Sequence, residues 1–260
     1  MSNSSLVSYT RISSHKNSPR QMEIDRITPH CIVGQWTAKQ GCDYFATVNR
    51  DVSSNYVIGK NGDVGLSVDE RDRSWCTSSP ANDHRAITIE CASDTFHPYA
   101  MTNAVFETLV NLSTDICRRY GKTKLIWIPN RERALAYNPK SDEMLITVHR
   151  WFSHTVCPGD WLYQRLNVLA LRVTNNLGGK VEAPAKEKKK QDSGSYLVHV
   201  TVGALNIRQG AGTNTKIVGT IRDSGVYTII EEQDGVGATK WGKLKSGAGW
   251  IALDYVQRLS

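Results

Sequence analysis

The chain has 260 residues, and 32 Lys and Arg against 25 Asp and Glu give it a net charge of +7. This length suits one domain of middle size and one small domain. The basic excess favours anionic partners, such as the acidic polymers of a bacterial cell wall. Outside 179–194 no stripe of Lys and Arg is interleaved with aromatic residues, so we expect no nucleic-acid partner. No run of about 18 apolar residues occurs, so we expect no transmembrane segment.

The first residues and the cysteines both bear on where the protein is made. A signal peptide has a charged region followed by an apolar one, and the start of this sequence has neither. We therefore expect synthesis in a host cytoplasm without a signal peptide. The 6 cysteines are irregularly spaced in a long chain, which favours free thiols over a disulfide scaffold.

The first 27 residues are polar, show no periodicity and predict an extended arm. The β-rich run 27–36 predicts a buried strand. Successive side chains of a strand point to opposite faces, so His30 and Cys31 cannot both face one metal ion. A hairpin follows over 53–68, with its turn at the Asn-Gly pair 61–62.

Strands and helices then alternate. The run 85–91 predicts a strand that ends near Glu90, and strands are also expected at 124–129 and 145–148. Apolar residues three and four positions apart predict two amphipathic helices. The first contains Val105, Leu109, Leu112 and Ile116 and ends near Gly121, and the second covers 162–177. This order indicates an α/β fold with a mixed β-sheet flanked by helices.

The composition changes after residue 178. Residues 179–194 are densely charged, lack apolar periodicity and predict a solvated linker. From 195 to 260, short β-rich runs are separated by Gly, Asn, Asp and Ser, which predicts a small all-β barrel. We therefore expect a first domain at 1–178 and a second at 195–260.

One stretch carries the residues of a metal site. His149 and Cys157 lie eight positions apart, just before Pro158 and Gly159. Imidazole nitrogen and thiolate sulfur are ligands that zinc prefers, and a catalytic zinc site has three protein ligands and an open position for water. Spacing alone leaves two candidates for the third ligand. They are His30, on a predicted strand, and His154, which is close in sequence to both partners.

Residues 27–160 resemble the zinc-dependent N-acetylmuramoyl-L-alanine amidases shared by phage endolysins and peptidoglycan-recognition proteins. The matching pieces are Ile27-Thr28-Pro29-His30, Ser54-Asn55-Tyr56-Val57-Ile58 with Asn61-Gly62, Ser74-Trp75, Ile87-Thr88-Ile89-Glu90 and His149 through Cys157-Pro158-Gly159. The resemblance implies that His30, His149 and Cys157 bind Zn²⁺. It also implies that Glu90 assists the attacking water and that Thr155 helps to hold the oxyanion.

The chain departs from this family's pattern at three positions. Thr155 stands where many members have Lys, so oxyanion stabilisation should depend more on the metal. Cys31 and Cys76 stand where members often have His. Neither is a metal-ligand position in the family, so we expect altered packing or substrate contact there rather than loss of the metal.

The second domain resembles a bacterial SH3 domain. The matching pieces are Ala204 through Gly210, Gly219-Thr220-Ile221, Trp241 through Leu244, Gly249-Trp250-Ile251 and Tyr255. Such domains bind peptidoglycan or its peptides in aromatic-lined grooves. Trp241 and Trp250 are candidates both for ligand contact and for the barrel core.

Together these features predict an N-acetylmuramoyl-L-alanine amidase that acts on the bacterial cell wall as a phage or prophage endolysin. It would cleave the amide between the lactyl group of N-acetylmuramic acid and L-Ala by zinc-activated water. One alternative is a non-catalytic peptidoglycan-binding protein on the same fold. Another is a cysteine peptidase with Cys157 or Cys31 as nucleophile. The oligomeric state and any contact of His154 with substrate stay open.

Overall fold

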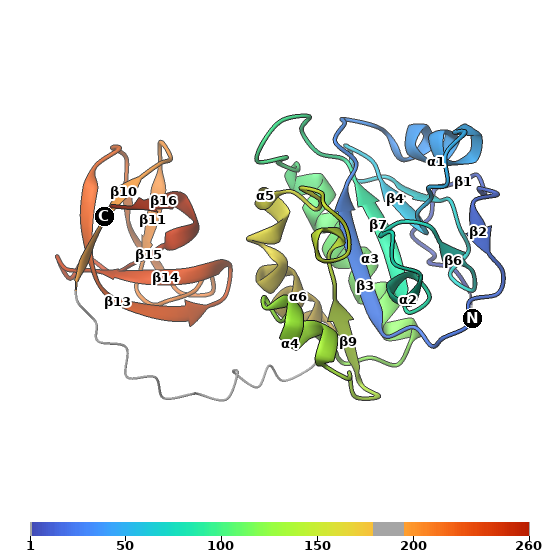
Figure 1. Cartoon of the computed structure of the whole chain (residues 1–260). Coiled ribbons are helices and arrows are strands. Elements are labelled where there is room, and N and C mark those ends of the chain that lie inside the picture. The colour runs from blue at the N-terminus through green and yellow to red at the C-terminus, as the bar shows by residue number, and fades with distance from the viewer. Residues whose placement is uncertain (1, 179–194, 260) are drawn as a thin grey trace. The chain divides into compact units, whose positions relative to one another are not determined.

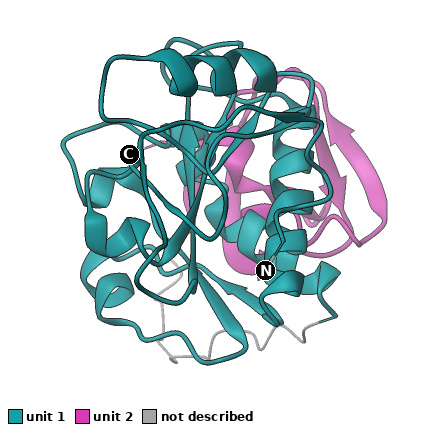
Figure 2. Cartoon of the chain, turned by 90° about the vertical axis from the view of Figure 1, so that its right-hand side faces the viewer, with its two compact units in different colours: residues 1–181 teal, residues 182–260 magenta. Residues whose placement is uncertain are grey.

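The computed structural model describes residues 2–178 and 195–259. They belong to two compact units, residues 1–181 and 182–260, which Figure 2 colours separately. The predicted linker 179–194 lies outside the described residues, and the predicted domain limits 1–178 and 195–260 stay a prediction. No helix among the described residues is long and apolar enough to span a membrane.

The first unit contains a seven-stranded mixed sheet, which confirms the predicted fold class (Figure 1). In spatial order its strands are β1 Tyr9–Thr10, β5 Val64–Leu66, β4 Tyr56–Ile58, β7 Ala86–Cys91, β3 Arg26–Cys31, β9 Glu143–Ile146 and β8 Lys124–Ile126. Only β4 and β5 pair antiparallel, as the predicted hairpin requires, and all other neighbours are parallel. The strand predicted at 124–129 is shorter, and it is half-buried because it lies at the edge.

One face of the sheet is apolar. Ile27 of β3 and Ile87 and Ile89 of β7 pack in a single cluster with α3 (Asn103–Arg119) and α6 (Leu166–Asn176). All three isoleucines are fully buried. Burying apolar side chains of this size stabilises the fold by about 1.5–3 kcal/mol each. This face is the main core of the unit.

The opposite face is polar, because the alternate residues of the same strands point there. The hydroxyls of Thr28 and Thr147 are 2.7 Å apart, and the Asn82 amide donates to Thr28 at 3.1 Å. Asn82 belongs to α2 (Pro80–Asp83), which Figure 1 shows on the other side of the sheet from α3. Buried polar groups need partners of this kind. The candidate site lies on this face.

The helices differ from the prediction in two respects. The helix expected at 162–177 is divided into α5 (Asp160–Tyr163) and α6, because Arg165 has φ −108° and ψ 2° and leaves helical geometry. Three further helices, α1 (Ala38–Thr47), α2 and α4 (Arg131–Ala136), were not predicted. All three are short, and polar residues N-cap them: Thr37 caps α1, Ser79 caps α2 and Asn130 caps α4.

The N-terminal arm is better ordered than its sequence predicts. β1 extends the main sheet, and β2 (Lys16–Asn17) pairs with β6 (Arg73–Ser74). Arg20 lies between β2 and β3 in the sequence. Its guanidinium donates to five main-chain carbonyls, those of Glu70, Asp72, Asp83, His84 and Ala86. The anchoring is polar, so it leaves no apolar periodicity to detect.

The second unit is an all-β structure, as predicted. Its seven strands pair antiparallel throughout, in the order β12 Ile217–Ile221, β11 Leu205–Arg208, β15 Trp250–Ala252, β14 Ala238–Leu244, β13 Val226–Gly235, β10 Tyr196–Val200 and β16 Val256–Arg258. A short 3₁₀ helix, η2 (Leu253–Tyr255), precedes β16. Trp241 and Trp250 are 2% and 8% exposed, so both belong to the interior.

Candidate metal centre

The register of two parallel strands brings a histidine and a glutamate together. His30 of β3 lies directly opposite Glu90 of β7, so both side chains project from the polar face. His30 Nδ1 is 3.8 Å from Glu90 Oε1. Glu90 is paired on both sides, with His30 of β3 and Val57 of β4, whereas His30 is paired with β7 alone because the β3–β9 pairing ends at Ile27.

The segment after β9 adds the second imidazole and the thiol. His149 begins the 3₁₀ helix η1 (His149–Trp151), and its ring centroid is 5.1 Å from that of His30. The Arg150 amide donates to the Cys157 carbonyl at 3.1 Å and closes the loop between them. Cys157 Sγ is thereby placed 3.2 Å from His30 Nδ1.

These three side chains form a group that fits a metal ion. One ligand atom each from His30, His149 and Cys157 lies within 4.8 Å of the others. Tetrahedral zinc, with bonds of about 2.3 Å to sulfur and 2.0 Å to nitrogen, separates two such ligands by about 3.5 Å. Both histidines have an Nε2 atom, and Glu90 an Oε2 atom, that is buried without a hydrogen-bond partner among the described residues. Such atoms are costly unless a ligand satisfies them.

Burial favours the neutral form of every group in the cluster. It lowers the pKa of His30 well below its usual value, to which nearby His149 contributes, and it lowers the pKa of His149. Burial raises the pKa of the Cys157 thiol, and the neighbouring Cys31 raises this pKa further. Burial also raises the pKa of Glu90 to about 7. Neutral imidazoles are ready to bind a cation, whereas the thiol would release its proton on binding.

Thr155 and His154 lie on the loop before Cys157 and are placed differently. Thr155 is half-buried, and its hydroxyl oxygen accepts a hydrogen bond from the Cys157 amide at 3.2 Å. Its hydroxyl proton is left for another acceptor. His154 is exposed. Of the two candidates for the third ligand, His30 is the one that lies with His149 and Cys157 in the described part of the chain.

Cys76 is a neighbour of Glu90 that sequence reasoning did not connect with it. Its sulfur is 3.9 Å from Glu90 Oε1, and its side chain is buried. Buried Asp83 holds this loop by accepting from the amides of Cys76 and Thr77, each at 3.1 Å, and from the Thr77 hydroxyl at 2.6 Å. The only sequence signal was a cysteine at a position where the resembling family often has histidine.

The fold and the site together define a class: an α/β protein with two imidazoles and a thiol gathered beside a half-buried carboxylate, joined to a small all-β unit. Residues 20–160 match the family model described as N-acetylmuramoyl-L-alanine amidase, and residues 203–257 match the bacterial SH3 domain. The chain belongs to the N-acetylmuramoyl-L-alanine amidase family. Both predicted resemblances and the predicted enzyme class are confirmed.

Solved structures give a more distant likeness. The structure of PlyL is 14% identical over 64% of this chain and 95% of its own, with a TM-score of 0.47. The catalytic domain of XlyA is 12% identical over 63% and 99%, with a TM-score of 0.44. The N-acetylmuramoyl-L-alanine amidase LysC from Clostridium intestinale URNW is 15% identical over 65% and 99%, with a TM-score of 0.40. Comparison with curated protein sequences gives no significant match.

Proposed function

We propose that this chain is a zinc-dependent amidase that cleaves peptidoglycan between the lactyl group of N-acetylmuramic acid and L-Ala, and that it acts as a phage or prophage endolysin. The observation that carries the proposal is the group formed by His30, His149 and Cys157 beside Glu90, in a chain of the amidase family. Amide hydrolysis needs a nucleophilic water, a proton carrier and a means to stabilise negative charge on oxygen. The site offers a residue for each need.

His30, His149 and Cys157 would hold the ion, with the fourth position open. When bound, Zn²⁺ supplies Lewis acidity, which lowers the pKa of a bound water to about 7 and polarises a carbonyl. Two neutral imidazoles and one thiolate form a ligand set that zinc favours. Family membership supports this choice of metal.

Glu90 would carry the proton. Its Oε1 lies near His30 and Cys76, whereas Oε2 has no hydrogen-bond partner among the described residues. The side chain is 13% exposed, so it retains a narrow path to solvent. Burial raises the pKa of this carboxyl group, whereas a bound cation would favour its carboxylate form, which can accept a proton from water and donate it to the leaving amine of L-Ala.

Thr155 would stabilise the developing negative charge on the substrate carbonyl oxygen. Its hydroxyl oxygen is held by the Cys157 amide, which orients the remaining proton. A hydroxyl donates one hydrogen bond without charge, so its share should be smaller than that of a lysine. His154 has no role in this scheme.

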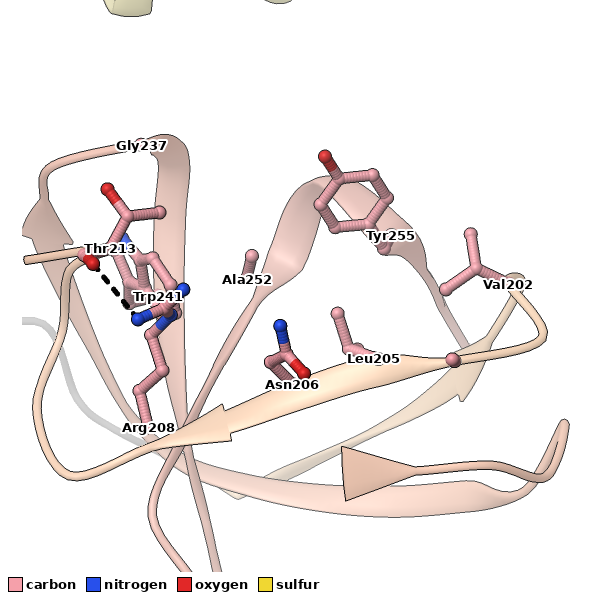
Figure 3. Close-up of a pocket in the computed structure, with 10 residues that line it drawn as sticks. Val202, Leu205, Asn206, Arg208, Thr213, Gly237, Trp241, Ala252 and Tyr255 are labelled. Atoms are coloured by element: carbon pink, nitrogen blue, oxygen red, sulfur yellow. Dashed lines mark hydrogen bonds between the residues drawn. The ribbon is translucent and has the colours of Figure 1, made fainter. Parts of the chain in front are cut away.

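The second unit would bind the cell wall. A pocket of about 360 Å³ lies among β11, β14, β15 and η2, with Tyr255 at one end and Arg208 and Trp241 at the other (Figure 3). Tyr255 is 39% exposed. The Arg208 guanidinium donates to the Thr213 and Thr215 carbonyls. A wall-binding unit raises the effective concentration of substrate for a tethered enzyme.

The two alternatives explain less of the site. A non-catalytic peptidoglycan-binding protein needs neither three metal ligands nor a largely shielded carboxylate beside them. A cysteine peptidase needs a reactive thiolate, whereas Cys157 is buried and its thiol pKa is raised. Pro158 follows Cys157 directly. Burial lowers the pKa of His30 beside Cys157, so His30 is a poor partner for a thiolate.

The test is mass spectrometry of purified peptidoglycan after incubation with the protein, with and without a chelator. We expect free stem peptides that begin at L-Ala, abolished by the chelator and restored by Zn²⁺. Cleavage within the peptide that persists in chelator would favour the cysteine peptidase. Walls that bind the protein but stay intact would favour the non-catalytic protein.

Glu90→Gln separates the proton carrier from the metal site. Losing general acid–base catalysis should lower kcat by about 10²- to 10⁴-fold. The zinc content should stay unchanged, because Glu90 is not among the three proposed ligands. The matched control is Glu107→Gln, at an exposed glutamate on α3. A Glu90→Gln enzyme of normal rate would remove Glu90 from the mechanism.

A further inference from the structure

Next to the proposed zinc ligands lies a second set of metal-binding atoms. His30, Cys76 and Glu90 also bring one ligand atom each within 4.8 Å of one another. Cys76 is 6% exposed and the Glu90 side chain 13%, so both are largely shielded from water. His30 is common to this set and to the zinc-binding set, so the two overlap.

The distances within this second set suit tetrahedral coordination. Cys76 Sγ is 3.9 Å from Glu90 Oε1, and that oxygen is 3.8 Å from His30 Nδ1. A tetrahedral zinc ion separates a sulfur and an oxygen ligand by about 3.6 Å, and a nitrogen and an oxygen by about 3.4 Å. Shifts of a few tenths of an ångström would close the site.

Two residues of the set each carry a further polar atom that is buried and unpartnered in the described part of the chain, beside the Nδ1 and Oε1 atoms that set the distances above. Nε2 of His30, which is 1% exposed, and Oε2 of Glu90 have no hydrogen-bond partner among the described residues. The loop that carries Cys76 is fixed by buried Asp83, so the sulfur is held beside the carboxylate. A thiol, a carboxylate and an imidazole together select thiophilic cations such as Zn²⁺ and Cd²⁺ over Mg²⁺ or Ca²⁺.

We infer that Cys76 and Glu90 form a second, inhibitory site for a thiophilic cation, to which His30 belongs when the first site is empty. His30 Nδ1 faces both Cys157 and Glu90, so it cannot serve two ions at once. With the first site filled, the second ion has Cys76, Glu90 and water as ligands, and it binds more weakly than the first. Binding displaces one proton from the Cys76 thiol and occupies Glu90. The inhibition, but not the binding, rests on the proposed function.

The inhibition has a simple origin. Glu90 with a cation on its carboxylate no longer accepts a proton from water. Activity should therefore rise until the first site is filled, and should fall when excess Zn²⁺ or Cd²⁺ fills the second. Cys76→His would supply nitrogen in place of sulfur and would weaken the preference for Cd²⁺.

The test uses the full chain loaded with one equivalent of Zn²⁺ and titrated with CdCl₂ or further ZnCl₂. Binding is followed by the ultraviolet absorption of cadmium–thiolate bonds without peptidoglycan, and inhibition by the clearing of cell-wall suspensions. We expect Cys76→Ala to lose the additional cadmium–thiolate absorption. In Cys76→Ala we also expect a rise of at least about tenfold in the Zn²⁺ concentration that halves activity, measured relative to each variant's own maximum activity. Loss of other groups around metal sites weakens metal binding by a similar factor.

Two controls keep the outcome clear. Cys117→Ala removes a buried cysteine of α3 and should bind and respond as the unaltered chain does. Cys76→Ser preserves the side-chain volume if the alanine variant is unstable. Equal inhibition of the Cys76 variants and the unaltered chain, or no added absorption in the unaltered chain, would overturn the inference. Absence of cleavage at every metal concentration would instead defeat the proposed amidase, and the absorption result would still decide the second site.

Discussion

Glu70 offers a sharp test of how the N-terminal arm is held on the catalytic unit. Its carboxylate is 1% exposed and accepts four hydrogen bonds. Two come from Arg119, at 2.6 and 2.7 Å, one from Tyr56 at 2.5 Å and one from Tyr120 at 2.9 Å. Arg119 also donates to the Ser2 carbonyl, so the arm depends on this cluster.

Glu70→Gln keeps the size of the side chain but removes its charge and one acceptor oxygen. Breaking a buried ion pair by altering one partner costs about 3–5 kcal/mol of unfolding free energy. In a unit of this length, 1 kcal/mol lowers Tm by about 2–4 °C, so we expect a fall of roughly 6–20 °C. The Arg119 side chain is 19% exposed, so solvent screening should bring the value toward the lower end.

The matched control is Glu107→Gln. Glu107 also makes two hydrogen bonds of 2.6 Å to an arginine, Arg172, but their side chains are 53% and 33% exposed. Exposed pairs contribute about 0–1 kcal/mol, so Tm should fall by no more than about 4 °C. The measurement is differential scanning calorimetry of the full chain. Equal shifts for the two variants would refute the reasoning that burial makes Glu70 important.

Three further predictions concern function. Thr155→Val should lower kcat by about 10- to 100-fold, because a hydrogen bond to a charged group contributes about 1.5–3 kcal/mol, and the zinc content should stay unchanged. Thr155→Ser should retain most of the activity. A valine variant of normal rate would exclude Thr155 from oxyanion stabilisation. Cys157→Ser should weaken zinc binding by more than about 100-fold in equilibrium dialysis, because a direct ligand contributes more than the groups around it. Cys42→Ser, at a buried cysteine of α1, should bind zinc normally, and equal affinities would contradict the ligand assignment. Tyr255→Ala, in a Glu90→Gln background that prevents cleavage, should weaken pelleting with cell walls about 2- to 10-fold, as expected for one aromatic contact. Tyr227→Ala, outside the pocket around Tyr255, should pellet normally, and the same loss there would count against that pocket.

Much of the fold follows from the sequence because its signals are local. Alternating apolar residues mark β7, four-three-four spacing marks α3, and the change of composition after residue 178 marks the second unit. The elements that were missed have weak local signals. Helices α1 and α4 are short, and polar contacts rather than apolar spacing hold the N-terminal arm.

Some residues of the candidate site could likewise be predicted from the sequence, and others could not. The sequence by itself identified His149, Cys157 and the strand ends that carry His30 and Glu90, because strand periodicity and ligand chemistry are readable along the chain. By spacing it left both His30 and His154 open as the third ligand, and the resemblance to a family favoured His30. The tertiary structure separated them, because the β3–β7 register places His30 beside Glu90 whereas His154 remains in solvent. It alone brought Cys76 to Glu90, since that contact depends on a loop that buried Asp83 holds through main-chain amides, and no local sequence pattern predicts such a contact.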